Sequence, residues 1–185
     1  MEAILLDIPD QLTTERLMLR APRLGDGAMI NPCIVESAAE LARWMPWARP
    51  TPDVDNSEKW CRSSVAKFVT REQLDFLIFL REPETYVGTC SLHRIDWNVP
   101  KAEIGYWLRT PHCGHGYVSE ATKALTDLAF QVLKMHRVEI RCDAENRRSR
   151  RVAELAGFKQ EGILRNETRE NDKLRDTCIF SSIPE

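Results

Sequence analysis

Two glycines that flank a histidine, where an apolar strand pattern gives way to a helical one, are the first residues that suggest chemistry. Gly114, His115 and Gly116 lie in the stretch YWLRTPHCGHGYVSE, which runs from Tyr106 to Glu120. Glycines have no Cβ, so several backbone N–H groups can converge at such a turn. The following helix begins with unpaired N–H groups and a positive partial charge. The pattern predicts a site for an anion such as a pyrophosphate, and an ordinary strand-to-helix turn is the alternative.

The spacing of these glycines differs from the two familiar nucleotide-binding signatures. Ser119 stands where GxGxxG requires its third glycine, and no GxxxxGK[ST] motif occurs in the chain. Neither signature therefore applies, and what remains is a GxG pair at the start of a helix.

A further glycine lies inside the strand that leads into this turn. Gly105 interrupts the apolar stretch KAEIGYWLR, where an interior glycine usually marks a bulge or a close approach of the backbone. A bulge would splay the sheet and free the backbone N–H and C=O groups of Tyr106, Trp107 and Leu108. An extended, amide-bearing arm such as pantetheine could then pair with this strand.

The run HCGH raises the question of a metal or a nucleophile. His112, Cys113 and His115 supply too few ligands at irregular spacing, and no partner cluster lies elsewhere in the sequence, so we expect no metal. A thiol at a helix N-terminus can be reactive, but reactivity alone assigns no role to Cys113.

Length, charge and cysteine usage limit the class of protein. The length of 185 residues argues for a single domain over residues 1–185. The net charge of −2 argues against DNA or membrane-surface binding. Its six cysteines form no CxxC pair, and the N-terminus lacks a basic segment followed by an apolar run. No apolar run approaches the ~18 residues of a membrane span. We expect a cytoplasmic protein with reduced thiols.

Strand and helix patterns are mixed along the whole chain, which predicts an α/β or α+β domain. A first helix is predicted to begin at Asp26, as a cap, and to be interrupted at Pro32. Further helices are predicted at residues 37–44, 55–71, 116–134 and 147–156. Strands are predicted at residues 16–21, 74–80, 86–95, 101–109, 137–143, 158–165 and 177–182, the last two as a hairpin closed by a charged loop. Trp44 and Trp47 lie in a loop between helices and could form a wall of an acceptor pocket, with simple packing as the alternative.

Several of these motifs occur together in one family. With YWLRTPHCGHGYVSEA followed by NRRSRRVAELAGF, and with TERLMLR and AEIGYWL before them, the sequence resembles the GNAT N-acetyltransferases. Within that superfamily it resembles the branch that acetylates ribosomal-protein N-termini (RimJ/RimL-like), over nearly the whole chain. The resemblance implies a mixed, splayed central β-sheet flanked by helices, with acetyl-CoA as cosubstrate and no metal.

The resemblance also implies a binding role for particular residues. The pyrophosphate would lie on the turn formed by Cys113, Gly114, His115, Gly116 and Tyr117. Asn146 would hydrogen-bond the cofactor arm, and it can also be a plain helix N-cap, because one amide both accepts and donates. Arg148 and Arg151, three residues apart, could contact the 3′-phosphate of the cofactor, touch ribosomal RNA or simply form a solvated helix face.

The sequence departs from the family pattern at two places. Pro111 stands where a glutamine or arginine is common, and Ala153 stands where many members carry a tyrosine that protonates the departing thiolate. Ser149 occupies the position of a serine near the CoA sulfur in the ribosomal-protein branch. A hydroxyl there can donate a hydrogen bond or relay a proton from water, or Ser149 can simply belong to the helix cap.

Glu103, on the predicted splayed strand, is the best candidate for the general base that accepts the proton of the acceptor amine. An exposed glutamate without a catalytic role is the alternative, and Glu167 or water could also act as base. In the branch with the serine a glutamate acts after the penultimate strand, where Thr168 stands here, beside Glu167.

The expected reaction is direct attack of a primary amine on the thioester in a ternary complex. An α-amine is favoured because it is partly neutral at cytoplasmic pH. It could belong to a protein N-terminus such as that of a ribosomal protein, or to an amino-acid-like small molecule. A non-catalytic acyl-CoA-binding module and a detoxifying acetyltransferase are the alternatives, and a homodimer is possible. The sequence does not identify the acceptor.

Overall fold

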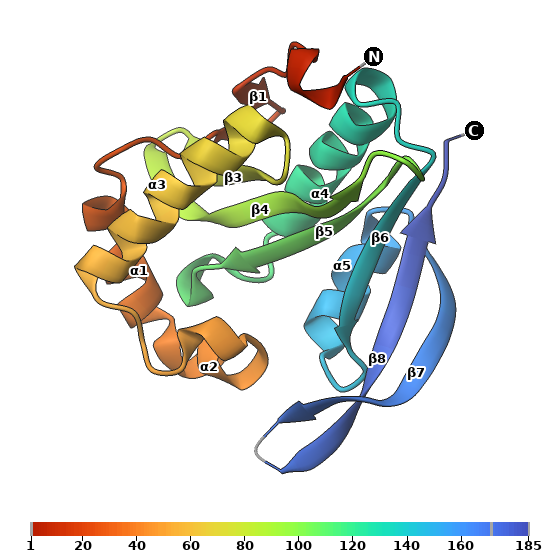
Figure 1. The fold of residues 1–185 in the computed structure, drawn as a ribbon. Helices are drawn as coiled ribbons and strands as arrows, with labels where there is room; N and C mark the ends of the chain where they lie inside the picture. Colours follow the sequence, from red (N-terminus) through yellow and green to blue (C-terminus); the bar gives the residue numbers. More distant parts are fainter. Residues whose placement is uncertain (1, 171, 185) are drawn as a thin grey trace.

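The computed structural model describes residues 2–170 and 172–184, whose strands form one eight-stranded mixed sheet in the order β1-β2-β3-β4-β5-β6-β8-β7 (Figure 1). Every neighbouring pair is antiparallel except β5 and β6. The strands are β1 (Gln11–Thr13), β2 (Leu17–Arg20), β3 (Leu74–Arg81), β4 (Glu84–Asp96), β5 (Lys101–Leu108), β6 (Arg137–Asp143), β7 (Lys159–Glu170) and β8 (Lys173–Ser182). The α/β class and the mixed, splayed sheet predicted above are confirmed.

The helices cover both faces of this sheet, with α3 in front and α4 and α5 behind in Figure 1. Their bounds are α1 (Gly27–Glu36), α2 (Ala38–Trp44), α3 (Val54–Thr70), α4 (Tyr117–Asp127) and α5 (Arg147–Leu155). A π-helical turn, Leu128–Val132, continues α4, and short 3-10 turns lie at Ala3–Leu5, Pro46–Ala48 and Thr110–His112. Within the described ranges, no helix has both the length and the apolar character needed to cross a membrane.

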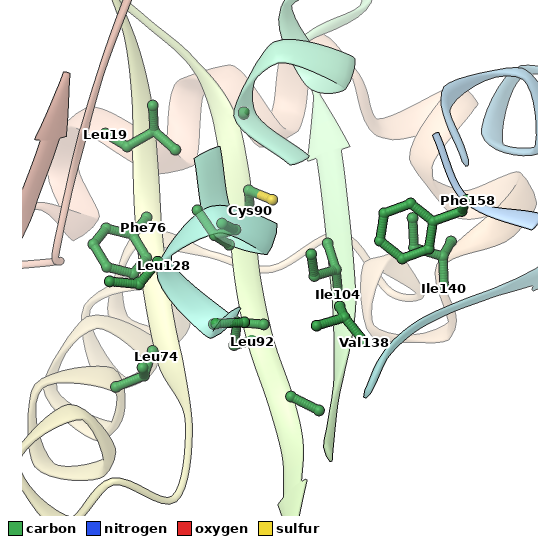
Figure 2. Close-up of a cluster of buried hydrophobic side chains, with 14 of the residues drawn as sticks. Leu19, Leu74, Phe76, Cys90, Leu92, Ile104, Leu128, Val138, Ile140 and Phe158 are labelled. Carbon is green, nitrogen blue, oxygen red and sulfur yellow. The ribbon is translucent and has the colours of Figure 1, made fainter. Parts of the chain in front are cut away.

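The main core fills the space between the sheet and the α4 and α5 layer. It takes alternate side chains from the central strands, including Leu74 and Phe76 from β3, Cys90 and Leu92 from β4, and Ile104 from β5 (Figure 2). These side chains are all within 1% of complete burial. Because side chains alternate between the faces of a strand, the residues between them must point to the α1, α2 and α3 side.

The sheet is splayed between β5 and β6. These strands pair in parallel only from Lys101 to Glu103 on β5 and from Arg137 to Glu139 on β6, and beyond Glu103 they separate. Figure 2 shows Ile104 next to Val138 where the separation begins, with Ile140 and Phe158 packed together further along β6. The backbone of β5 after Glu103 is therefore without a strand partner on its β6 side.

The predicted bulge at Gly105 is wrong. The ladder between β4 and β5 is regular from Gly88–Leu108 to His93–Glu103, and its irregularity lies beyond His93. The glycine is needed for another reason, because a Cβ at Gly105 would lie 2.8 Å from His93 Nε2. The close approach is therefore made by a side chain of the neighbouring strand.

Two other local predictions need correction. The carboxylate of Asp26 does not cap α1, because it binds the Arg20 guanidinium at 2.7 and 2.8 Å and accepts from the backbone N–H of Arg23. The loop predicted between the last two strands is itself strand up to Glu170 and from Lys173. Ion pairs such as that between Arg49 and Glu170 stabilise this exposed arm, so its sequence lacks the apolar alternation that marks a strand.

Candidate active site

A cavity of about 630 Å³ opens where β5 and β6 separate, on the face of the sheet covered by α1, α2 and α3. Both separating strands line it, through Tyr106 and Trp107 on β5 and Arg141 and Cys142 on β6. Trp44 and Trp47, predicted as a possible pocket wall, lie in this lining. Among the side chains predicted to take part in the reaction or to hold the cofactor arm, Glu103, Ser149 and Asn146 line the cavity too.

The floor of the cavity is a row of polar side chains that the strand register places on one face. Asp75 on β3 lies opposite Ser91 on β4, and Ser91 lies opposite Gly105 on β5. His93 and Glu103 lie opposite each other one step further along the same face. These residues alternate with the apolar residues of the main core, so the two-residue period separates polar floor from core.

Glu103 is held inside this row with its side chain 12% exposed. Its Oε2 accepts a hydrogen bond from the Arg94 guanidinium at 2.9 Å, and its Oε1 lies 3.8 Å from His93 Nε2. Burial raises the pKa of Glu103, and this effect outweighs the attraction of Arg94 and Arg141. A carboxylate with a raised pKa is the better proton acceptor, which is the property a general base needs.

His93 is a cavity residue that the sequence reasoning missed. Its imidazole lies over Gly105, and burial followed by the nearby charge of Arg94 lowers its pKa, against the opposing effect of Asp75. It therefore stays neutral at pH 7 and above, and one ring nitrogen can accept while the other donates. The interior Gly105 could have indicated it, because a glycine inside a strand leaves space for a side chain of the neighbouring strand.

A pair of residues with hydroxyl groups, Tyr106 and Ser149, also lines the cavity. The Tyr106 hydroxyl is 2.9 Å from Ser149 Oγ and donates to the Ser149 backbone carbonyl at 3.1 Å. Burial raises the pKa of Tyr106, so its proton is retained at neutral pH. Sequence reasoning gave Tyr106 a role through its backbone and missed the hydroxyl, because no local pattern shows that β5 meets α5 there.

Asn146 holds the start of α5 and so positions Ser149. Its Oδ1 accepts a hydrogen bond from the Ser149 N–H at 3.0 Å, as a helix N-cap does. The cap uses only the oxygen of this amide. The Nδ2 group of Asn146 has two donors, so a hydrogen bond to a ligand in the cavity is compatible with the cap.

The GxG turn follows the end of β5 and leads into α4. Gly114 and Gly116 adopt φ angles of 87° and 80°, where a side chain would be strained. No side chain caps the α4 N-terminus within the described chain, so its first N–H groups are available to an anion. Residues 113–117 do not line the cavity itself, so this turn and the cavity are two adjoining parts of the candidate site.

Arg16, the residue directly before β2, holds this turn in place. Sequence reasoning missed this arginine. Arg16 donates to the His115 carbonyl at 3.0 Å and pairs with Glu120 of α4 at 2.6 Å. Its guanidinium also lies 4.9 Å from the centroid of the Tyr117 ring, on which the His115 ring stacks. Because these contacts join residues about a hundred positions apart, no sequence spacing indicates them.

Other candidates lie away from the cavity. Arg148 and Arg151 are absent from its lining, are largely exposed and contact Glu40 at 3.4 Å and Glu154 at 3.1 Å. Glu167 also lies outside the lining, where hydrogen bonds from Thr177 and Arg141 lower its pKa. Its lowered pKa makes Glu167 a weaker base than Glu103.

The thiols near the site are not activated. Burial raises the pKa of Cys113, beside the turn. Burial also raises the pKa of Cys142, in the cavity lining, to about 11. A thiol with a raised pKa stays protonated at neutral pH and is a poor nucleophile. Over residues 2–170 and 172–184, no group of three His, Cys, Asp or Glu side chains is arranged to hold a metal ion.

The fold agrees with what comparison with known proteins shows. The acetyltransferase (GNAT) domain matches residues 16–159, which is most of the chain. The chain belongs to the GNAT acetyltransferase family. It is an N-acetyltransferase by class, as its family and relatives show.

Two curated relatives and one solved structure show how this GNAT acetyltransferase is related to others. It is 31% identical to the uncharacterized N-acetyltransferase p20 of Bacillus licheniformis over 93% of this chain and 95% of that protein. It is 30% identical to the ribosomal-protein-serine acetyltransferase of Escherichia coli (strain K12), over 76% and 79% of the two chains. The structure of the microcin C7 self-immunity acetyltransferase MccE with acetyl-CoA and AMP shares its fold, with a TM-score of 0.87, 23% identity and coverage of 92% and 94%. The predicted relationship to the ribosomal-protein branch is thus confirmed as a distant one.

Proposed function

We propose that this GNAT acetyltransferase transfers the acetyl group of acetyl-CoA to a primary amine, by direct attack in a ternary complex. The observation that carries the proposal is the cavity at the separation of β5 and β6, which is lined by Glu103 and by the hydrogen-bonded pair Tyr106 and Ser149. This arrangement supplies a proton acceptor for the amine and hydroxyl groups for the leaving thiolate.

The residues present fit acetyl-CoA at three points. The N-terminus of α4 has no side-chain cap and follows two glycines with positive φ, which suits a pyrophosphate. The backbone of β5 from Tyr106 to Leu108 has no partner on the β6 side, which suits the amides of the pantetheine arm. The Nδ2 of Asn146 can add a hydrogen bond to that arm. Acetyl-CoA then supplies the thioester whose acetyl group is transferred.

The acceptor amine attacks as the free base, and Glu103 takes up the proton that it loses. A C–N bond forms and the C–S bond breaks, so the amine releases one proton and the thiolate gains one. A backbone N–H of β5 near Trp107 or Leu108 donates to the carbonyl oxygen as it becomes negative. Ser149 Oγ, hydrogen-bonded to Tyr106, relays a proton from water to the departing sulfur, and the proton held by Glu103 then passes to solvent, where it neutralises the hydroxide that is left. The protonated state of Cys142 argues against a covalent acetyl-cysteine on the way.

The acceptor we favour is an α-amine, at a protein N-terminus or in an amino-acid-like molecule. An α-amine with a pKa near ~8 is partly neutral at pH 7, whereas a lysine near ~10.4 is almost wholly protonated. Glu103 remains a carboxylate and is a weak base for a lysine even with its pKa raised. The identity to the ribosomal-protein-serine acetyltransferase supports a ribosomal-protein N-terminus as one member of this class.

Release of CoA thiol tests the proposal, with the protein offered peptides with free N-termini, lysine peptides with blocked N-termini, polyamines and aminoacyl analogues. We expect turnover on α-amines that falls in Glu103→Gln and Ser149→Ala. Glu154→Gln, at an exposed glutamate on α5, is the matched control and should keep its activity. Binding of acetyl-CoA without turnover on any amine would favour a non-catalytic binding module, and failure to bind acetyl-CoA would overturn the proposal.

A further inference from the structure

A buried carboxylate on the floor of the cavity lacks a partner for one of its oxygens. Asp75 is 2% exposed, and its Oδ1 accepts a hydrogen bond from Gln73 Nε2 at 2.8 Å. Its Oδ2 has no hydrogen-bond partner in the protein, one of four such buried side-chain atoms within the described residues. The other three atoms belong to two arginines and a threonine, so Asp75 supplies the one carboxylate oxygen among these four atoms.

An unpaired buried carboxylate oxygen is costly for folding. Removing a partner from a buried charged group costs more than the ~1–3 kcal/mol of a neutral one, so such groups are kept where another requirement favours them. Asp75 lies on β3, at the centre of the sheet, in a strand whose neighbours Leu74 and Phe76 are completely buried. Those two neighbours point to the opposite face of the sheet, and an apolar side chain at position 75 would avoid the cost of a buried unpaired oxygen, which points to a role in binding.

The position of Asp75 relative to the reacting groups follows from the strand register. Asp75, Ser91 and Gly105 lie in line across β3, β4 and β5, and Asp75 lines the same cavity as Glu103. Neighbouring strands are about 4.8 Å apart, so Asp75 lies roughly 10 Å from the β5 backbone where the thioester would be held. A ligand that reaches both places must extend across two strand spacings.

The other charged groups around the cavity do not neutralise Asp75. Arg94 binds Glu103 at 2.9 Å, and Arg141 is paired with Glu167. The cavity walls near the floor are aromatic, with Trp60 from α3 and the Trp47 and Trp107 rings at a centroid distance of 6.0 Å. Aromatic faces attract cations and exclude water, so they add to the preference of a carboxylate for a positive ligand.

We propose that Asp75 selects acceptors that carry a second cationic group, roughly 10 Å from the amine that is acetylated, by accepting a hydrogen bond from that group at Oδ2. The inference rests on the proposed acetyl transfer and narrows its substrate class. An α-amine followed by a lysine at the second position has this spacing, because consecutive Cα atoms are about 3.8 Å apart and the lysine stem adds the rest. A long α,ω-diamine presents the same two charges without a peptide.

Steady-state kinetics on matched acceptors test the inference. The peptide pair is alanyl-lysine amide and alanyl-norleucine amide, which differ in the distal ammonium, and the diamine pair is 1,7-diaminoheptane and heptylamine. We expect the wild-type protein to favour the dicationic member of at least one pair by roughly 10- to 100-fold in kcat/KM, the range for a hydrogen bond to a charged group. The pair with the larger ratio identifies the source of the ligand.

Asp75→Asn should bring that ratio close to one, because the amide keeps the shape and removes the charge. Asp127→Asn, at an exposed aspartate on α4 behind the sheet, is the matched control and should keep the wild-type ratio. The melting temperature of Asp75→Asn should equal or exceed that of the wild type, since a buried unpaired charge is lost. A merely structural aspartate would instead give a lower melting temperature and an unchanged ratio.

Binding measurements separate failure of this inference from failure of the proposed function. Calorimetry of the same acceptor pairs in the presence of CoA gives their affinities whether or not turnover occurs. Preferential binding of a dicationic acceptor that depends on Asp75 would support the inference even if no acetyl transfer is seen. Equal affinities within both pairs, or a preference that survives Asp75→Asn, would overturn it and leave acetyl transfer to other amines standing.

Discussion

The two faces of the central sheet are built from the same strands but, within the described residues, only the face toward α1, α2 and α3 carries a polar cavity floor beside its apolar packing. On the face toward α4 and α5, residues such as Leu92 and Ile104 are almost completely buried among other apolar groups (Figure 2). On the opposite face, Asp75, His93 and Glu103 line a cavity of about 630 Å³. Around the cavity, adjacent residues of one strand therefore have different roles, one side chain packing in the core and the next presenting a polar group. Further along the same face, Leu77 and Phe79 pack in a second apolar cluster.

The difference shows that a strand can carry polar side chains that lower the stability of the fold when apolar side chains on its other face are sufficiently buried. Each apolar side chain in the core contributes about 1.5–3 kcal/mol of burial free energy. Polar groups in the floor, such as Asp75 and the partly buried Glu103, work against folding. The comparison can be tested by changing neighbouring residues that point to opposite faces.

The largest effect on stability is expected at the core face. Leu92→Ala removes a completely buried side chain and should lower the free energy of unfolding by about 2–5 kcal/mol. His93→Ala, one residue along β4, should change stability by much less and should lower acetyl transfer. Denaturant unfolding and thiol-release kinetics on both variants measure the contrast. Equal losses of stability would show that the two faces are not separated in this way.

On the cavity face, the largest effect is expected at Glu103. Glu103→Gln should lower kcat/KM for an α-amine by about 100-fold, the lower end of the range for general acid–base catalysis. The raised pKa of Glu103 gives the sign of the pH dependence, because its proton-accepting form is lost as pH falls through that raised value. The wild-type profile should therefore contain a loss of rate at acid pH, above the range of an ordinary glutamate, that is missing from Glu103→Gln. Identical profile shapes would assign the base elsewhere.

A smaller effect is expected from the two hydroxyl groups. Tyr106→Phe and Ser149→Ala should each lower kcat by about 10-fold, a loss typical of one hydrogen bond in a reacting site. Because the hydroxyls are 2.9 Å apart, the double variant should lose less than the product of the two single losses. Independent, multiplying losses would show that the two hydroxyls do not act as one relay.

The smallest effect is expected at Gly105. Its added Cβ in Gly105→Ala would lie 2.8 Å from His93 Nε2, so the imidazole must move, and we expect a stability change of about 1 kcal/mol or less together with reduced activity. In a His93→Ala background the same substitution should have no further effect on activity. A loss that persists in that background would point to the β5 backbone, and not to room for the imidazole, as the reason for the glycine.

The sequence predicted the elements with a strong local signal. The alternating β6 segment Arg137–Asp143 and the α5 helix beginning after Asn146 lie where their patterns indicated. The predicted turn at Gly114 and Gly116 is present, and both glycines adopt positive φ angles there. Prediction failed where a side-chain partner outside the helix replaced the expected cap, as at Asp26, whose carboxylate binds Arg20 and does not cap α1.

The candidate site shows the same division. Glu103, Ser149 and Asn146 could be proposed from spacing and from the family resemblance, and all three line the cavity. His93, Arg16 and the Tyr106 hydroxyl could not be proposed in this way. The partner of Tyr106 lies 43 positions away and that of Arg16 lies 104 positions away. The partner of His93 lies on a neighbouring strand. Arg148 and Arg151 looked suitable by helical spacing, yet they lie outside the cavity lining.

The sequence by itself determined most of the strands and helices, the glycine turn and the chemical family, because these depend on side-chain period, backbone freedom and short motifs. It did not indicate β1 or the outer part of the β7–β8 hairpin. Only the tertiary structure decided which polar groups share the cavity, because the register of β3, β4 and β5 brings Asp75, His93 and Glu103 together from separate strands. It also decided the protonation tendencies of these groups, since burial and neighbouring charges shift the pKa of Glu103 and His93 in ways that no linear spacing encodes.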